Sequence, residues 1–224
     1  MLSEVVITSQ ASKNRLSAAQ MGTEKLSTAE IANVPVFLGE KDIIKTIQLL
    51  PGVKTTGEGS GGFYVRGGNI DENLLLLDEV PVYNATHLLG FFSTFNSDAI
   101  KDLTLYKGAM PSQYGGRLSS VVDIRTRDGN NQAFHGSGGL GIIASHLNLE
   151  GPLLKDKASF MLSARRSYAD LFLKLSPNED VKNSNLYFYD VNAKLSYNLD
   201  DHNRIFLSFY NGRDNLKISH DLDL

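Results

Sequence analysis

The sequence contains no cysteine among its 224 residues. This absence excludes disulfide bonds, zinc sites built on thiolates and a cysteine nucleophile. The histidines include no pair at the spacing that places two metal ligands on one face of a helix, so we expect surface or capped histidines and no metal or cofactor. These histidines are His87, His135, His146, His202 and His220. The neighbouring acids fit no calcium loop and are expected in turns and at strand ends. They are Asp71, Glu72, Asp78 and Glu79.

Long apolar runs are also missing. No segment approaches the roughly 18 apolar residues of a membrane-spanning helix, and the first residues lack the basic start and apolar core of an export signal. Hydropathy alone therefore indicates a soluble protein. Strands of an outer-membrane barrel, however, alternate lipid-facing and lumen-facing residues and never form a long apolar window. This absence leaves both classes open.

The sequence has little net charge and few catalytic motifs. A net charge of −3, with no dense lysine or arginine cluster, gives no field to attract nucleic acid, so we expect no nucleic-acid partner. Two G-x-G-x-x-G matches, at residues 57–62 and 136–141, run into strand-like residues where a dinucleotide site requires a helix. A Walker loop and a G-x-S-x-G elbow are absent. We expect no enzyme and no catalytic residue.

The stretch from Gly61 to Asn84 predicts two strands joined by a turn. Phe63 to Arg66 forms the first strand, glycines and an asparagine form the turn, and the apolar run from Leu74 to Leu77 forms a strand covered on both faces. Two more strands are expected at residues 103–108 and 121–126. Together they predict a small mixed sheet of about four strands.

Short helices are expected around this sheet. Ser27 and Glu30 form a capping box that predicts a helix from Ser27 to Ile31. A second helix is predicted from about Gly39 to Leu50, because Pro51 and Gly52 end an amphipathic run. A single helical turn is predicted at residues 96–100.

The periodicity changes to two residues in the second half of the chain. From Tyr187 to Leu199 apolar or aromatic side chains alternate with polar ones, and residues 205–209 repeat the pattern after a turn at Asp200 to Asn203. A slip in phase near residues 142–143 predicts a hairpin of two short strands between Phe134 and Pro152. A soluble sandwich shows the same alternation, so periodicity leaves a sandwich and a barrel open.

Two phrases of the sequence, VRGG…NLLLLDEVPVYN and GFFSTFNSDAIKDLTLYKGAMPSQYGGRLSSVVDIRTRDG, resemble the plug domain of TonB-dependent outer-membrane transporters. The resemblance covers roughly Leu2 to Gly129 and continues more weakly to the end. It implies an α+β plug domain, with a small mixed β-sheet and short helices, followed by antiparallel β-strands of an incomplete transmembrane β-barrel. The expected divisions are a TonB-box segment and flexible tether at residues 1–20, a plug domain at 21–130 and the first barrel strands at 131–224.

The resemblance also implies a function. The plug would gate the barrel lumen during active import across the outer membrane of a Gram-negative bacterium, energised by the periplasmic C-terminal domain of TonB. The other partners would be outer-membrane lipid and an imported small ligand of unknown class, with siderophore, glycan, peptide and cobalamin all open. The residues themselves leave an alternative, a soluble β-rich interaction or scaffold module without transport activity.

Two sets of site residues follow from the resemblance. The β-prone run Glu4, Val5, Val6, Ile7 and Thr8 is by propensity a first edge strand or a detachable strand, and the family implies that it is the TonB box. The resemblance maps Arg66 and Lys107 to the basic residues that lock the plug to glutamates on the barrel wall. Without the resemblance, both side chains could equally be solvated charges on the surface.

The family further implies an orientation for the barrel strands. The apolar positions Tyr187, Val191, Leu195 and Leu199 are expected to face lipid. The polar positions Asp190, Asn192 and Lys194 are expected to face the lumen and plug. The turns at residues 154–157 and 200–203 would be periplasmic, and residues 176–185 external.

Overall fold

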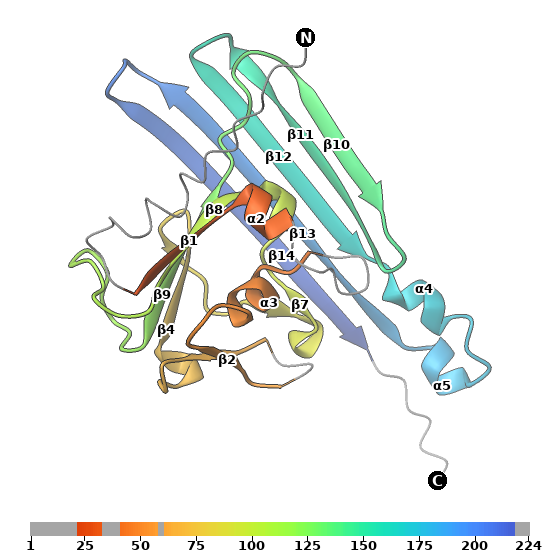
Figure 1. Ribbon diagram of the computed structural model, residues 1–224. Helices are drawn as coiled ribbons and strands as arrows, with labels where there is room; N and C mark the ends of the chain where they lie inside the picture. The colour runs from red at the N-terminus through yellow and green to blue at the C-terminus, as the bar shows by residue number, and fades with distance from the viewer. Residues whose placement is uncertain (1–21, 33–40, 58–60, 218–224) are drawn as a thin grey trace, which may run out of the picture.

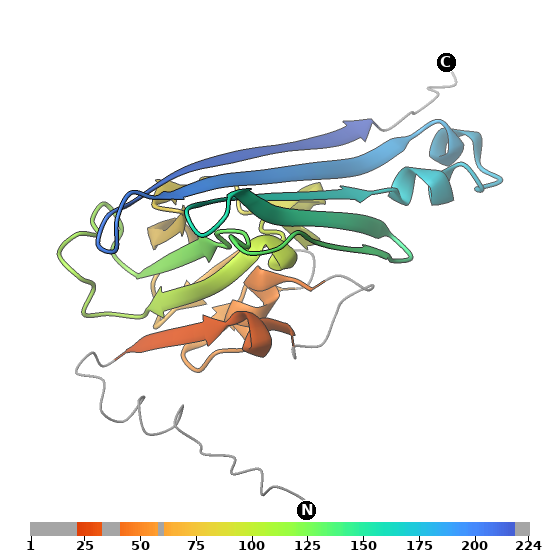
Figure 2. The ribbon, with the colours of Figure 1, turned by 90° about the horizontal axis from the view of Figure 1, so that it is seen from above.

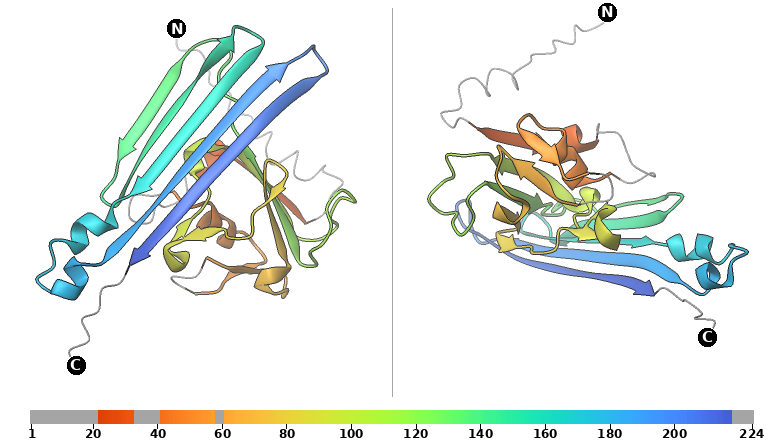
Figure 3. Two further views of the ribbon diagram at one scale, coloured as in Figure 1. Left: turned by 180° about the vertical axis from the view of Figure 1, so that it is seen from behind. Right: turned by 90° about the horizontal axis from the view of Figure 1, so that it is seen from below.

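The computed structural model describes residues 22–32, 41–57 and 61–217. An N-terminal unit of short strands and helices, β1 to β9, lies against one face of a sheet of long antiparallel strands, β10 to β14 (Figure 1). Seen from above, the long-stranded sheet forms a separate layer that extends beyond the N-terminal unit (Figure 2). Seen from behind, the same sheet lies in front of part of that unit (Figure 3).

The main sheet of the N-terminal unit has five strands in the order β1-β8-β9-β4-β5. β4 and β9 are parallel, and the other pairs are antiparallel. The strands are β1 (Thr23–Ser27), β4 (Asn73–Leu77), β5 (Val80–Pro81), β8 (Ile100–Tyr106) and β9 (Ser120–Thr126). The strands expected at residues 74–77, 103–108 and 121–126 are therefore confirmed, apart from a shift of a few residues at the start of β8.

Two small hairpins and several short helices surround this sheet. The hairpins are β2 (Val53–Thr55) with β3 (Phe63–Val65), and β6 (Thr86–His87) with β7 (Phe92–Ser93). The helices are α2 (Thr28–Ala32), α3 (Ile43–Gln48), and the 3-10 turns η1 (Ile70–Glu72), η2 (Leu88–Gly90) and η3 (Ser97–Ala99). The helical turn expected at residues 96–100 is η3, and the Asn96 side chain accepts a hydrogen bond from the Asp98 backbone.

The capping residues set the helix starts. The Glu30 carboxylate accepts hydrogen bonds from both the backbone N–H and the hydroxyl of Ser27, each at 2.9 Å, which confirms the predicted capping box. The second helix is shorter than predicted. Residue 39 lies outside the described residues, and within them the helix begins after Asp42, whose carboxylate accepts from Lys45 N at 3.0 Å, and ends at Gln48.

Two strand predictions need correction. The strand expected at Phe63 to Arg66 ends at Val65 and pairs with β2, outside the main sheet. Arg66 instead begins the turn, with a positive φ of 48°, and Gly68 N donates to Val65 O at 2.9 Å. β1 was not predicted. It is an edge strand that buries only Leu26, so its sequence TEKLS carries little of the alternation that marks a half-buried strand.

The core of the N-terminal unit lies between the main sheet and α3. Its apolar side chains come from α3, β3, β8 and β9, and each is no more than 2% exposed. They are Ile43, Ile44, Ile47, Phe63, Val65, Leu103, Leu105, Val122 and Ile124. The predicted apolar face of the second helix is therefore confirmed, and it packs on the sheet as expected.

The long-stranded sheet is an antiparallel meander in chain order. Its strands are β10 (His135–Leu140), β11 (Ala144–Leu154), β12 (Ala158–Ser167), β13 (Asn185–Asn198) and β14 (Arg204–Lys217). The predicted hairpin with a break near residues 142–143 is confirmed as β10 and β11. Two short helices that the sequence did not indicate, α4 (Ala169–Leu173) and α5 (Glu179–Lys182), join β12 to β13. They lie at one end of the sheet, and the β13–β14 turn lies at the other (Figure 1).

The two faces of β13 differ as its alternation predicts. Asp190, Asn192 and Lys194 are at most 4% exposed and face the N-terminal unit, whereas Leu195 is 47% and Leu199 54% exposed. These polar side chains thus point to the covered face, which they share with the buried Phe188, and Leu195 points to the open face. In the part of the chain that the structure describes, no helix has both the length and the apolar character needed to cross a membrane.

Candidate functional site

Polar side chains line the face of the long-stranded sheet that meets the N-terminal unit. They lie at alternate positions of β12 and β13, on a face that also carries Met161 and Phe188, and each is at most 5% exposed. They are Ser159, Ser163, Arg165, Ser167, Asp190, Asn192, Lys194 and Ser196. Buried charges are tolerated only when they are paired and hydrogen-bonded, so the partners of these side chains decide how the two layers are held together.

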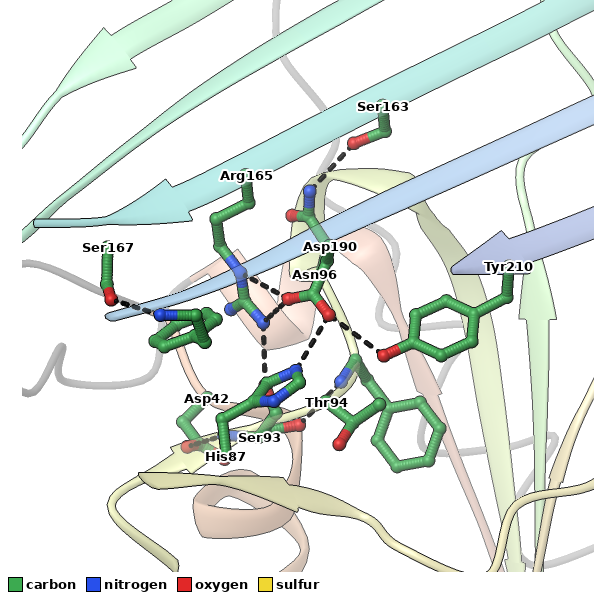
Figure 4. Close-up of polar contacts among 12 residues, drawn as sticks. Asp42, His87, Ser93, Thr94, Asn96, Ser163, Arg165, Ser167, Asp190 and Tyr210 are labelled. Atoms are coloured by element: carbon green, nitrogen blue, oxygen red, sulfur yellow. Dashed lines mark hydrogen bonds and ion pairs between the residues drawn. The ribbon is translucent and has the colours of Figure 1, made fainter. Parts of the chain in front are cut away.

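His87, from β6 of the N-terminal unit, lies between two carboxylates of the long-stranded sheet, of which Figure 4 shows Asp190. Its Nε2 is 2.7 Å from Asp190 Oδ1 and its Nδ1 is 3.0 Å from Asp214 Oδ1. The ring stacks on Phe188, with centroids 4.5 Å apart. Burial alone would lower the pKa of His87, but the hydrogen bond and charge of Asp190, together with Asp214, outweigh it and raise the pKa above its usual range. His87 was expected to be a surface or capped histidine, and it is buried, with only 4% of its surface exposed.

Asp190 is the centre of this network, named here the histidine cluster (His87, Arg165, Asp190, Tyr210 and Asp214). Arg165 donates to Asp190 Oδ2 from Nε at 3.1 Å and from Nη2 at 2.5 Å, and its Nη2 also donates to Ser93 O at 2.7 Å. The Tyr210 hydroxyl donates to Asp190 Oδ1 at 2.8 Å. Asp190 therefore receives hydrogen bonds from three strands at once, and Arg165 ties the N-terminal unit to β12 (Figure 4).

A neutral hydrogen-bond chain lies further along the same interface. Asn96 Nδ2, at the cap of η3, donates to Ser163 Oγ at 2.7 Å, and that hydroxyl donates to the Asn148 side chain on β11. The neighbouring Asn192 Nδ2 is buried without a hydrogen-bond partner among the described residues. The interface is therefore polar between its charged clusters as well as within them.

A second charged group, the lysine cluster, consists of Asp78, Thr126, Asp128, Lys194 and Ser208. Lys194 Nζ is 3.2 Å from Asp78 Oδ1 and 3.1 Å from Asp128 Oδ1, and it donates to Thr126 O at 3.2 Å. Asp78 also accepts from Thr126 N at 2.9 Å, from the Thr126 hydroxyl, and from Ser208 Oγ at 2.5 Å. Asp78, which was expected at a strand end, is thus a buried hydrogen-bond acceptor that joins the N-terminal unit to β13 and β14.

The two aspartates of the lysine cluster are held ionised. Burial alone would raise the pKa of Asp78, but hydrogen bonds from Ser208 and Thr126 and the charge of Lys194 bring the pKa below its usual value. Burial acts on Asp128 in the same direction, and there the hydrogen bond from Arg204 and the charge of Lys194 lower the pKa. Both carboxylates therefore stay charged at neutral pH.

The predicted lock residues lie together, away from these clusters. Lys107 is buried, with Nζ 3.2 Å from Glu24 Oε1 and donating to Pro51 O at 2.8 Å. The exposed Arg66 extends its guanidinium past Gly22 and Gly108, where an added Cβ would come within 3.1 Å of it. Among the described residues, the ionic partner of Lys107 comes from the N-terminal unit. The predicted TonB-box residues Glu4, Val5, Val6, Ile7 and Thr8 lie outside the described residues.

A cavity of about 540 Å³ opens on the N-terminal unit beside the histidine cluster. One wall comes from η1 and β4, with Ile70 and Leu74, and the opposite wall from residues 81–90. Arg117 and Asp71 add charges of opposite sign at the lining. Leu88, next to this wall, packs with Phe92 and Phe188 and with the partly buried Ile143 and Leu186, so the wall lies toward the end of the long-stranded sheet that carries α4 and α5. Sequence reasoning did not identify this cavity.

Two comparisons with known proteins found similarities, one to a domain model and one to solved structures. Residues 17–122 match the profile of the TonB-dependent receptor plug domain. The siderophore receptor PirA from Acinetobacter baumannii aligns over 96% of this chain and 34% of its own, with 19% identity and a TM-score of 0.65. The outer membrane transporter YddB from Escherichia coli aligns over 87% and 33%, with 14% identity and a TM-score of 0.63. The ferric citrate transporter FecA, in its unliganded form, aligns over 92% and 33%, with 16% identity and a TM-score of 0.60.

These solved structures share the fold with this chain, which spans about a third of their length. A search of curated proteins found no match. The shared fold extends across both layers, because the alignments cover almost all of this chain. The expected architecture, an α+β unit with a mixed sheet and short helices followed by antiparallel strands of an incomplete barrel, is therefore confirmed.

Proposed function

We propose that this chain, whose residues 17–122 match the plug domain of TonB-dependent receptors, belongs to a receptor that imports a ligand across the outer membrane of a Gram-negative bacterium. The N-terminal unit is the plug, and β10 to β14 are the first strands of the barrel whose lumen it closes. TonB, the periplasmic energy-transducing protein, drives the opening. The soluble scaffold module is disfavoured because the plug covers only one face of a sheet whose other face is apolar and open.

The observation that carries this proposal is the polar interface between plug and strands. If the interface were apolar, the plug and the strands would share one hydrophobic core. Separating them would then expose that apolar surface to water at a high cost in free energy. The histidine and lysine clusters instead join the layers through hydrogen bonds and ion pairs, which water can replace when the layers part. Interfaces of this kind between domains allow relative motion. The plug is thus held in one position and remains releasable.

The energised step is assigned to the segment Glu4, Val5, Val6, Ile7 and Thr8. Its β-prone residues suit capture by strand addition, in which the backbone of an extended segment pairs with the edge of a partner sheet. The partner is the periplasmic C-terminal domain of TonB. Since this segment precedes β1 in the chain, a pull on it acts first on the edge strand of the plug sheet.

The membrane contact is assigned to the open face of the long strands. Ile205, Leu207 and Phe209 on β14 are each at least 58% exposed, and Leu195 and Leu199 extend the same apolar character on β13. Burial of these side chains in hydrocarbon would remove that area from water. We place the short turns at residues 154–157 and 200–203 on the periplasmic side, and α5 outside.

The ligand site is assigned to the cavity on the plug. It lies toward the α4 and α5 end of the strands, the end placed outside the cell, and its volume suits a small molecule. The names of two solved relatives refer to a siderophore and to ferric citrate. Iron chelates are therefore the first ligand class to test for this receptor, followed by glycans, peptides and cobalamin.

Binding of the full-length receptor to the TonB C-terminal domain tests this assignment. Val6→Pro should abolish the binding, because proline cannot donate a backbone hydrogen bond to an added strand. Ala11→Pro, outside the assigned TonB box, is the matched control and should bind as the wild type does. Equal binding by Val6→Pro and the wild type would remove residues 4–8 from the mechanism.

A further inference from the structure

The segment from His87 to Gly90 belongs both to the cavity and to the interface with the barrel strands. Leu89 and Gly90 line the cavity, and Leu89 is 79% exposed. His87 and Leu88, one step earlier in the chain, are 4% and 6% exposed and are buried against the strands. Whatever holds His87 therefore also fixes the position of this cavity wall.

The backbone of the segment is strained. Leu88 and Leu89 are consecutive residues with positive φ, at 49° and 61°, a region that side chains with a Cβ rarely adopt. Strain of this kind persists only where the surroundings hold it, and it is concentrated at ligand sites and switches. Here the holding contacts come from the barrel strands: Leu88 N donates to Asp214 Oδ1 at 3.4 Å, and the Leu88 side chain packs with Phe188.

The geometry around His87 favours a doubly protonated ring. A carboxylate can only accept hydrogen bonds, and both ring nitrogens lie within 3.0 Å of carboxylate oxygens, on Asp190 of β13 and Asp214 of β14. The other charged or titratable groups at this site are Arg165 of β12 and Tyr210 of β14, and both donate to Asp190. A neutral imidazole could donate to one carboxylate only.

We propose that His87 is a positioning residue of the ligand site, which as an imidazolium holds the cavity wall His87–Gly90 on β13 and β14 and releases that wall when it loses its proton. The contact is then a latch between the plug and the barrel whose state depends on one proton. This proposal rests on the proposed function in one respect, which is that the cavity is taken to be the ligand site. It can be measured with no ligand present, so its failure and a failure of transport are distinguishable.

The sign of the pH dependence follows from the two carboxylates. The folded protein raises the pKa of His87. The latch is therefore complete below the pKa of a free histidine and is lost as the pH rises through the higher pKa of the folded state. The lysine cluster provides a comparison within the same interface, because its charged groups are a lysine and two aspartates and it contains no histidine.

Pulsed electron paramagnetic resonance on the full-length receptor tests the latch. Spin labels at Leu89→Cys and Asn211→Cys report the distance from the cavity wall to β14. A second pair at Val80→Cys and Leu207→Cys reports the lysine cluster. Between about pH 6 and about pH 9 we expect the first distance distribution to broaden and the second to stay unchanged.

Two variants separate a proton-dependent latch from a purely structural role. With His87→Gln the first distribution should be broad at every pH, because glutamine is uncharged and carries both its N–H donors on one nitrogen, whereas an imidazolium donates from two separate ring nitrogens. With Asp214→Asn the broadening should occur at lower pH than in the wild type, because one charge that raises the pKa of His87 is removed. Asp214 is partly exposed, so this variant is the decisive one if His87→Gln does not fold. A wild-type distribution that is independent of pH, or an unchanged midpoint in Asp214→Asn, would overturn the proposal.

Discussion

Lys194 of β13 and Asp78 of the plug form a buried ion pair, with Nζ and Oδ1 3.2 Å apart and both side chains at most 5% exposed. The residues are 116 positions apart in the sequence, so the pair forms only when the plug is docked on the strands. The lysine also reaches Asp128, which makes it the cationic centre of the cluster. Removal of the Lys194 charge therefore measures directly how much this interface contributes to the free energy of plug docking.

Lys194→Met should weaken plug docking strongly. It leaves Asp78 buried without its cation, and loss of one partner of a buried pair costs about 3–5 kcal/mol. The measurement is the free energy of plug unfolding by urea in the full-length receptor. Lys101→Met is the matched control, because Lys101 pairs with the same Asp128 from a side chain that is 56% exposed. That change should cost only about 0–1 kcal/mol. Equal effects of the two substitutions would show that the lysine cluster does not hold the plug.

Acid should release the plug. The folded state lowers the pKa of Asp78 and of Asp128, so their contribution to stability is complete above the pKa of a free aspartate, about 3.9, and is lost as the pH falls through the lower folded values. We expect the free energy of plug unfolding to drop below about pH 4. Asp78→Asn should flatten that drop. A fall centred between about pH 5 and pH 7 would point to other groups.

Arg66 and Lys107 should have separate roles. Arg66→Ala in the full-length receptor should increase the leak of a large antibiotic more than Lys107→Ala does, because we assign to Arg66 the greater share of the lock to the barrel wall. Lys107→Ala should instead lower the stability of the plug by about 1–3 kcal/mol, since it leaves the Pro51 carbonyl without its ammonium donor. Negligible leak from both variants would contradict the lock assignment.

The orientation of the strands can be tested from outside intact cells. A maleimide that cannot cross the outer membrane should label Asn178→Cys, at the start of α5, and should not label His202→Cys, in the β13–β14 turn. Both positions are exposed on the protein itself, so a difference in labelling reports the membrane and not burial. His202→Cys should become reactive when the outer membrane is permeabilised. The opposite pattern would invert the orientation.

The sequence predicts which side chains of β13 face the plug, and it does not predict their partners. Strict alternation placed Asp190, Asn192 and Lys194 on one face because successive strand residues point to opposite sides. Which residue meets Asp190 depends on how two layers pack, and His87 lies 103 positions away. A histidine alone in a loop-like segment carries no local signal of that contact. A buried polar face on β12 and β13 was the available signal that such a partner exists.

The elements that sequence reasoning missed are those with weak local patterns. β1 is an edge strand with one buried residue, Leu26, and α5 is a four-residue helix with no buried residue. The predicted strand at Phe63 to Arg66 was wrong at its last residue, because Arg66 has a positive φ, as Gly67 after it also does. Strong patterns, such as the capping box of Ser27 and Glu30, were predicted correctly. Local chemistry thus determines these elements, and long-range packing determines the site.

The conductance of the full-length receptor in a planar lipid bilayer tests most directly whether the plug closes the lumen through its polar interface. We predict that the wild type is electrically silent, that urea opens a large conductance which disappears when the urea is removed, and that Lys194→Met opens at a lower urea concentration. A wild-type receptor that conducts steadily without urea, or a Lys194→Met variant that opens at the same concentration as the wild type, would contradict the account.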